Sequence, residues 1–210
     1  MLFRSPGLAG SSDEANAGDG AAALLFGDDS SGPVIAELIG GAFQSHEFLD
    51  RWRSVGSPAA KIWEERFAEA AYDPVVKAAV SDAYASAGIT PDQVDKVVMT
   101  GLAARAVRSA ARHVGVAPDK FVDTMDDTVG NTGAAHFALM LVHALETAAP
   151  GEIILVINAA DGCDVCVLRT TDAIAGYRSA KTVAAQVAGG NDGLDYAKFL
   201  TWKEIGRAHV

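Results

Sequence analysis

Apolar residues along the chain form short runs that are separated by polar and glycine-rich turns. Runs of this length, flanked by turn residues, predict buried strands. The last two runs are joined by the turn AADG and have the pattern of an antiparallel hairpin. We therefore expect one mixed sheet with strands near residues 20–26, 34–39, 96–100, 152–158 and 163–170.

Longer segments between these strands have the spacing of helices. Helices are expected over residues 65–70 and 74–87, and Thr90 to Gln93 has the sequence of a capping box that opens a short turn. Residues 132–148 are apolar on nearly every side, which is typical of a helix that is buried on most of its faces and packs against the sheet. Strands that alternate with helices predict an α/β layered domain.

A further helix is predicted over residues 103–114. Its buried stripe follows the i, i+3, i+4, i+7 spacing, at Val107, Ala110, Ala111 and Val114. Its basic residues lie on a different face, at Arg105, Arg108 and Arg112.

Composition and charge narrow the possible partners. Half of the 210 residues are hydrophobic, which is enough for a substantial core, and the formal net charge is −10. Such a surface repels phosphate backbones, so no nucleic acid partner is expected, although a local basic patch could bind the phosphate of a small cofactor. We find no secretory signal and no long apolar span, so no membrane association is expected and a cytoplasmic protein is the simplest interpretation.

Three segments, in this order, carry a family resemblance: GDGAAALLFG (18–27), VGNTGAAHFALML (129–141) and GEIILVINAADGCDVCVLRTTDA (151–173). They resemble the second half of thiolase-superfamily condensing enzymes, both ketoacyl synthase III and hydroxymethylglutaryl-CoA-synthase-like proteins. The resemblance covers roughly residues 15 to 175. It implies the C-terminal half of a thiolase-like layered αβαβα fold, with a mixed sheet and a buried central helix.

The resemblance also divides the chain. Residues 1–175 correspond to the C-terminal half of the thiolase-like domain, and residues 176–203 to an extension that precedes a zinc-ribbon and OB-fold segment in similar proteins. No CxxC…CxxC zinc pattern is present, so that segment is expected to be missing. The last residues, 204–210, read EIGRAHV. The codons GAG ATC GGA AGA GCA CAC GTC would encode them and spell a common sequencing adapter, so we expect that they are not natural protein sequence.

By resemblance, the function is that of an acyl-CoA acyltransferase that forms or breaks carbon–carbon bonds through a cysteine thioester. The nucleophilic cysteine of such enzymes lies in the N-terminal half, so this chain is expected to be an inactive fragment when alone. The expected substrates are coenzyme A thioesters, with no covalently bound cofactor and no metal, and the whole protein is expected to be a homo-oligomer. The alternative is a non-catalytic thiolase-fold subunit or scaffold that works beside a zinc-ribbon/OB-fold partner.

The resemblance points to two candidate catalytic residues. Asn131 matches the asparagine of the family's GNT segment, where a side-chain amide can donate to a developing oxyanion; asparagine is also a common helix cap. His136 is suited to proton transfer near neutral pH, as in thiolases with a catalytic histidine in this region. It could equally be a buried helix histidine with satisfied hydrogen bonds.

Two further positions bear on the chemistry. Arg105 lies where the family has an arginine near the coenzyme A entrance, and it could bind a phosphate or simply form part of a solvated helix face. The sequence from Thr100 to Ala103 lacks the histidine that similar enzymes carry after this strand, which favours the scaffold alternative. Cys163 and Cys166 form a CxxC within a predicted strand, where they face opposite sides, so we interpret them as small core residues rather than as a redox or metal motif.

Overall fold

The computed structural model describes residues 10–28, 30, 32–57, 59–101, 103–177 and 179–205. The N-terminal part contains α1 (Ser12–Ala15), β1 (Ala36–Ser45), β2 (Arg51–Trp52), β3 (Lys61–Ile62), α2 (Glu65–Ala87) and the 3-10 turn η1 (Pro91–Gln93). Then follow β4 (Lys96–Gly101), α3 (Ala104–Ala110), η2 (Ala111–His113), η3 (Pro118–Lys120), η4 (Gly133–Ala135) and α4 (His136–Glu146). The chain continues through β5 (Ile153–Ala159), β6 (Gly162–Thr170), η5 (Asp172–Gly176), α5 (Val183–Ala188) and α6 (Tyr196–Ile205).

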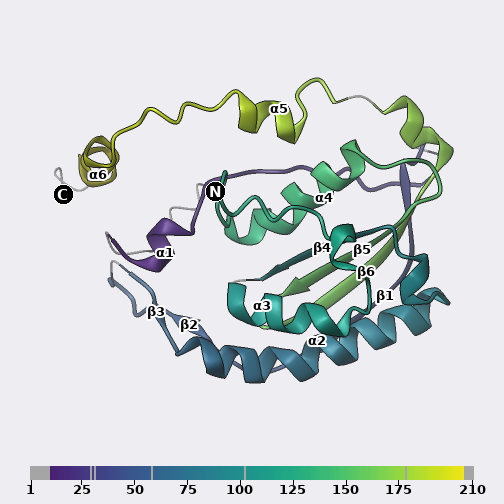
Figure 1. The fold of residues 1–210 in the computed structure, drawn as a ribbon, viewed down its shortest axis with the longest axis horizontal. Helices are drawn as coiled ribbons and strands as arrows, with labels where there is room; N and C mark the ends of the chain where they lie inside the picture. Colours follow the sequence, from purple (N-terminus) through teal and green to yellow (C-terminus); the bar gives the residue numbers. More distant parts are fainter. Residues whose placement is uncertain are drawn as a thin grey trace.

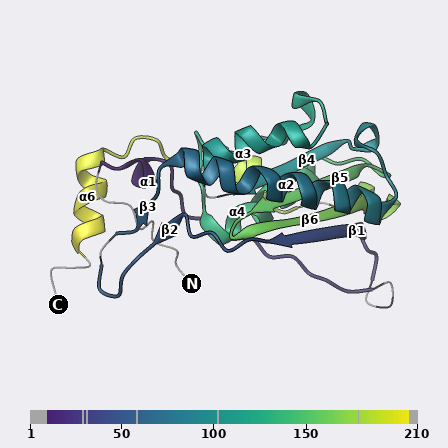
Figure 2. The ribbon, with the colours of Figure 1, turned by 90° about the horizontal axis from the view of Figure 1, so that it is seen from below.

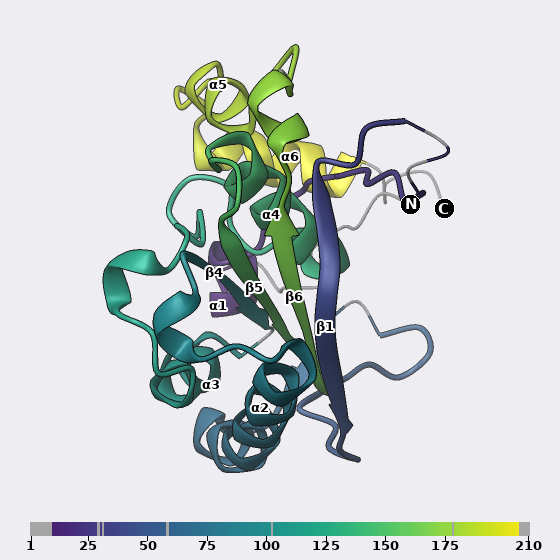
Figure 3. The same cartoon turned by 90° about the vertical axis from the view of Figure 1, so that its right-hand side faces the viewer.

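The central sheet has the strand order β1-β6-β5-β4 (Figure 3). β4 pairs with β5 in parallel, whereas β6 is antiparallel to both β5 and β1, so the prediction of a mixed sheet and of the closing hairpin is confirmed. The predicted strands 96–100, 152–158 and 163–170 correspond to β4, β5 and β6. The strand predicted at 34–39 begins slightly later and continues to Ser45, past an irregularity between Leu38 and Gly40.

The two faces of the sheet are covered by different helices (Figures 1 and 2). Side chains alternate along each strand, so Val97 and Leu155 pack in one core cluster with α2 and α3, whereas Val98 and Val156 pack in a second cluster with α4. The valine- and isoleucine-rich runs of β4 and β5 reflect this burial on both faces. The result is a helix–sheet–helix layering with α2 and α3 on one side and α4 on the other.

Helix α2 corrects the sequence prediction of two separate helices at 65–70 and 74–87. It is one continuous helix with Pro74 inside it. A proline inside a helix removes a backbone hydrogen bond and usually kinks or ends the helix. Here the apolar stripe continues across the proline, from Ala68 and Tyr72 to Val76 and beyond, and it is buried along its length. This tertiary packing offsets the local penalty.

Helix α4 confirms the helix predicted at 132–148, with a 3-10 turn, η4, at its start. Its buried face packs against the sheet and comprises His136, Met140, Leu141, Ala144 and Leu145. The capping box at Thr90 and Gln93 is also present. The helix predicted at 103–114 is α3 followed by η2, and its arginines are exposed as expected.

The strand predicted at 20–26 is wrong. Residues 18–28 are not part of any sheet, although Ala17 forms a single parallel bridge with Asn131. The side chains of Leu25 and Phe26 are 101% and 87% exposed. A strand needs a neighbouring strand for its backbone hydrogen bonds, and no strand in the described part of the chain pairs with this segment.

The C-terminal extension leaves the domain and runs along its outside (Figure 1). The backbone N–H of Val183 in α5 donates to Glu146 of α4 at 2.9 Å, and the Tyr196 hydroxyl of α6 donates to Glu14 of α1 at 2.8 Å. Two parts of the predicted segments lie outside the described residues. These are residues 1–9, at the start of the predicted thiolase-like half, and residues 206–210, in the segment predicted not to be natural protein sequence. No helix in the described part combines the length and apolar composition needed to cross a membrane.

Candidate active site

Asn131 lies where the carboxyl end of β4 meets the start of η4 and α4. Its Nδ2 donates to the carbonyl of Gly101 at 3.0 Å, and its Oδ1 accepts the backbone N–H of Gly133 at 2.9 Å. The amide therefore closes an i to i+2 turn just before η4, whose N-cap residue is Thr132, so Asn131 is not the helix cap that was one of its two predicted roles. Because Nδ2 carries two hydrogens and one of them binds Gly101, a second N–H is left to donate to a ligand. The turn contact and ligand binding are therefore compatible.

The GDG segment near the N-terminus holds Asn131 from the other side. The backbone N–H of Asn131 donates to Asn16 at 2.8 Å, and the N–H of Gly18 donates to the Asn131 carbonyl at 3.0 Å. A Cβ at Gly18 would lie 1.7 Å from the carbonyl oxygen of Val129. This close approach requires glycine, so the family-like GDG sequence has a local structural reason: it fixes the backbone of Asn131.

His136 is buried in the first turn of α4, with 2% of its surface exposed. Its Nδ1 lies 3.4 Å from the backbone N–H of Thr132. Burial lowers the pKa of His136, against the opposing effects of Asp126 and of a hydrogen bond to the Thr124 backbone. The side chain is therefore neutral near pH 7 and enclosed by protein. This geometry favours a structural role, and its participation in proton transfer stays a prediction.

The burial of His136 makes the stability of the domain depend on pH. Because the folded state keeps the ring neutral, the unfolded chain binds more protons as the pH falls below the ordinary value of 6.5. The free energy of unfolding is thus expected to decrease as the pH falls through that value, and His136→Gln should reduce this dependence. Urea unfolding at about pH 7.5 and about pH 5.5 measures it. The exposed His46→Gln is the control, and an unaltered pH dependence in His136→Gln would contradict the assignment.

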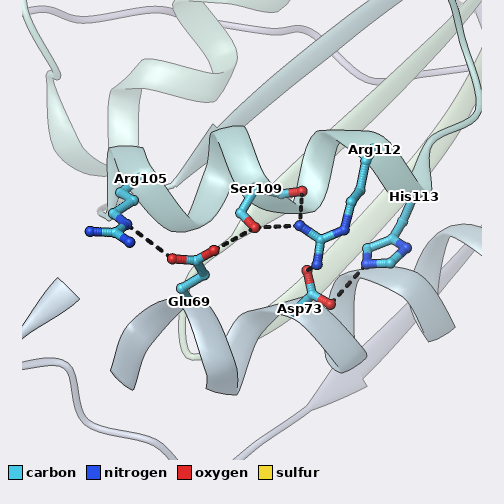
Figure 4. Close-up of polar contacts among 6 residues, drawn as sticks. All are labelled: Glu69, Asp73, Arg105, Ser109, Arg112 and His113. Atoms are coloured by element: carbon cyan, nitrogen blue, oxygen red, sulfur yellow. Dashed lines mark hydrogen bonds and ion pairs between the residues drawn. The ribbon is translucent and has the colours of Figure 1, made fainter. Parts of the chain in front are cut away.

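Arg105 belongs to a polar network between α2 and α3 (Figure 4). Its Nε donates to Glu69 at 3.0 Å, and the same carboxylate accepts the Ser109 hydroxyl at 2.8 Å. The Ser109 hydrogen bond is the main cause that lowers the pKa of Glu69. One turn further along, Asp73 binds Arg112 at 2.6 Å and His113 at 2.9 Å. These contacts join α2 to α3 and η2 and stabilise their packing. The binding of a phosphate by the exposed Arg105 stays a prediction.

The two cysteines face opposite sides of β6, as the strand geometry predicts. Cys163 is buried in the core, and burial raises the pKa of its thiol to about 12. Cys166 is exposed, so the prediction of a core residue is correct for Cys163 alone. Partial burial, reinforced by Asp164, also raises the pKa of Cys166. Within the described residues, no three His, Cys, Asp or Glu side chains are grouped as metal ligands.

Further polar residues lie at the carboxyl ends of β4 and β5 and beside Asn131 in the sequence. Thr100 is 6% exposed at the end of β4. Thr132 is 1% exposed, and its buried hydroxyl has no hydrogen-bond partner in the described structure. Asn158 is half-buried and occupies the same register position as Thr100 on the neighbouring strand β5. Only the strand register, which is not visible in the sequence, brings Thr100 and Asn158 together.

Comparisons with known proteins agree with this architecture. Residues 84–169 match the family model described as 3-oxoacyl-[acyl-carrier-protein (ACP)] synthase III C terminal. The fold is similar to that of 3-oxoacyl-[acyl-carrier-protein] synthase III from Aquifex aeolicus VF5, with a TM-score of 0.53 and 15% identity over 66% of this chain and 46% of that chain. The corresponding enzyme from Pseudomonas aeruginosa PAO1 gives 0.52 and 15%, over 64% and 44%.

A variant of OleA from Xanthomonas campestris is also similar, with a TM-score of 0.52 and 12% identity over 64% of this chain and 39% of that chain. No curated protein sequence matches the chain significantly. The chain spans less than half the length of each of these solved structures. Residues 84–169 therefore resemble the C-terminal part of 3-oxoacyl-[acyl-carrier-protein] synthase III, and the fold of the chain is similar to that of these condensing enzymes.

Proposed function

We propose that the chain is the C-terminal half of an acyltransferase that forms or breaks carbon–carbon bonds through a cysteine thioester, with the cysteine on the half of the enzyme that this chain does not span. The observation that supports this most strongly is the fixed amide of Asn131. It is held between the Gly101 carbonyl and the Gly133 N–H, and one N–H remains for a ligand.

The proposed role of Asn131 is to stabilise negative charge on a thioester oxygen. When a carbanion or enolate forms next to a thioester carbonyl, charge develops on the oxygen, and a rigidly held donor lowers the energy of that state. Asn131 is fixed by a strand end and a helix start, so it needs little reorganisation. The positive end of the α4 dipole lies nearby and adds a favourable electrostatic field.

The cysteines of this chain are poor candidates for the nucleophile. The thiolate is the reactive form of cysteine, and the raised pKa values of Cys163 and Cys166 keep both thiols protonated near neutral pH. Cys163 is in addition enclosed in the core. This supports a nucleophile that is contributed from outside residues 1–210.

Uncovered apolar surface supports the presence of a second half. Leu38 and Phe43 of the edge strand β1 are 67% and 73% exposed, and they line an open groove of about 500 Å³ over β1 and β6. Leu25 and Phe26 are also exposed. Contiguous apolar patches of this kind mark interaction sites. We propose that the remaining half of the enzyme covers them.

The subtype we propose is hydroxymethylglutaryl-CoA-synthase-like, because residues 169–202 resemble the segment that follows the closing hairpin in such proteins. The substrates would be coenzyme A thioesters, and the whole protein would be a homo-oligomer with a possible zinc-ribbon/OB-fold partner. The matched family model belongs to condensing enzymes, which favours an enzyme over a non-catalytic scaffold.

An activity assay tests this proposal. The longer protein that contains this chain is expected to release free coenzyme A from acetyl-CoA and to form a carbon–carbon condensation product with a second acyl-CoA. Residues 1–210 alone should form none, since the nucleophile is missing. Acetyl-, malonyl- and acetoacetyl-CoA are the substrates to supply, with product detection by mass spectrometry. Absence of product from the longer protein with all three would refute the proposed function.

A further inference from the structure

The C-terminal extension is attached to the rest of the chain at two places. At the first, Val183 of α5 is buried in the α4 core cluster, and its backbone N–H donates to Glu146 at the end of α4 at 2.9 Å. The extension then continues to α6, which lies beside α1 (Figures 1 and 2). There the Tyr196 hydroxyl donates to Glu14 at 2.8 Å. The extension therefore connects the end of α4 to α1.

Tyr196 contacts the residue that closes the first turn of α1. The Glu14 Oε2 that accepts the Tyr196 hydroxyl also accepts the backbone N–H of Gly10 at 2.8 Å. The N–H of Glu14 in turn donates to the side chain of the N-cap residue, Ser11, at 3.3 Å. A helix of four residues, as α1 is, is not stable through its own hydrogen bonds. The position of α1 therefore depends on contacts with other parts of the chain.

The backbone that follows α1 holds Asn131. The carbonyl of Asn16, the C-cap residue of α1, accepts the Asn131 N–H at 2.8 Å, and the Gly18 N–H donates to the Asn131 carbonyl at 3.0 Å. The two backbones are closely packed, since a Cβ at Gly130 would lie 2.8 Å from the carbonyl carbon of Ala17. A displacement of α1 would therefore also displace the backbone of Asn131.

We propose that Tyr196 and Glu14 are positioning residues for Asn131. Their hydrogen bond lets the C-terminal extension hold α1 in place, and α1 in turn holds the backbone of Asn131. The effect on catalysis rests on the proposed function, whereas the structural connection does not. The extension, although it lies outside the helix–sheet–helix layers, thereby influences the chemistry at the carboxyl end of β4.

Hydrogen exchange measures the structural connection directly. In the longer protein, Tyr196→Phe removes the hydroxyl and Glu14→Ala removes the carboxylate. Each is expected to speed the exchange of the Asn131 and Gly18 amide hydrogens by about 2-fold to 12-fold, the range for the net contribution of one hydrogen bond. The reason is that the hydrogen bonds of these amides open more often when α1 is released. Mass spectrometry of short overlapping peptides gives the exchange rates.

Steady-state kinetics measures the effect on catalysis. Tyr196→Phe and Glu14→Ala should each lower kcat for acyl transfer by up to about 12-fold, the same upper limit of one hydrogen bond. KM should stay within about twofold, because Asn131 is proposed to act on charge that develops only after the substrate has bound. Thermal unfolding of each variant confirms that the protein is folded, and Tyr196→Phe keeps the test informative if Glu14→Ala folds poorly.

Two variants serve as controls. Glu14→Gln keeps a side-chain oxygen that can accept both hydrogen bonds, so it should restore wild-type exchange and kcat relative to Glu14→Ala. Tyr84→Phe makes the same chemical change as Tyr196→Phe, because the Tyr84 hydroxyl also donates at 2.8 Å, but to the Val114 carbonyl, between α2 and the end of η2. It should leave kcat and the exchange of Asn131 unchanged.

The outcomes separate this inference from the proposed function. Unchanged exchange of the Asn131 and Gly18 amides in both Tyr196→Phe and Glu14→Ala would overturn the inference, whatever the activity. Faster exchange with wild-type kcat in an active enzyme would also overturn it, because Asn131 would then not need this support. Faster exchange in a longer protein that has no acyl transfer activity would refute the proposed function and confirm the connection between the extension and Asn131.

Discussion

Replacement of Asn131 by alanine in the longer protein is expected to lower kcat/KM by a factor that corresponds to about 2.7–4 kcal/mol of transition-state stabilisation. The reason is geometric: the amide is held by Gly101 and Gly133, so its remaining N–H is positioned before the charge develops. Steady-state kinetics of acyl transfer, with circular dichroism to confirm folding, gives the measurement.

The matched control for this substitution is Asn191→Ala. The side chain of Asn191 accepts the backbone N–H of Gly193 at 2.9 Å, the same i to i+2 hydrogen bond that Asn131 makes with Gly133 at 2.9 Å. Asn191 is exposed in the C-terminal extension, away from the strand ends. Asn191→Ala should therefore remove the hydrogen bond to Gly193 and leave the acyl transfer activity unchanged. If Asn131→Ala folds normally and retains wild-type kcat/KM, its role in the site is disproved.

The second large effect concerns stability. Leu155 lies in the middle of β5, is 0% exposed and packs in the cluster beneath α2 and α3. Leu155→Ala leaves a cavity in addition to the lost burial, and it is expected to lower the free energy of unfolding by about 2–5 kcal/mol. Urea denaturation of the isolated 210-residue chain, analysed by linear extrapolation, measures this change.

Leu25→Ala makes the same chemical change at a position that is 101% exposed. In the isolated chain it is expected to change the free energy of unfolding by no more than about 0.5 kcal/mol. Equal destabilisation by the two substitutions would show that residues 20–26 are buried in the domain, as the strand predicted from the sequence implied. The structure described above would then be wrong in this segment.

The parts of the fold that the sequence predicted well are those whose partners lie within the chain. The period of apolar residues in β4, β5 and β6 and in α4 reflects burial against neighbouring elements, so the pattern and the structure agree. Residues 20–26 have an equally apolar pattern. Such a pattern predicts that the side chains are buried, but it does not indicate which part of the protein covers them. Leu25 and Phe26 have no such cover here.

Pro74 shows the opposite limitation, because local propensity favoured a break where the packing of α2 maintains a helix.

The residues of the candidate site also differ in how far the sequence indicated them. Asn131 was identified through its motif, since the GNT segment is continuous in the sequence. The pairing of Thr100 with Asn158 depends on the register of two parallel strands, and no local pattern indicates it. The sequence left two roles open for His136, and the packing of the helix against the sheet shows that its side chain is buried.

The central claim is that this chain supplies an oxyanion-binding half to a nucleophile that it does not contain. The most direct test is to map the acyl group after the longer protein is incubated with labelled acetyl-CoA, by mass spectrometry of its peptides. The account predicts one acetyl thioester on a cysteine outside residues 1–210, with Cys163 and Cys166 unmodified. Stoichiometric labelling of Cys163 or Cys166 would contradict it.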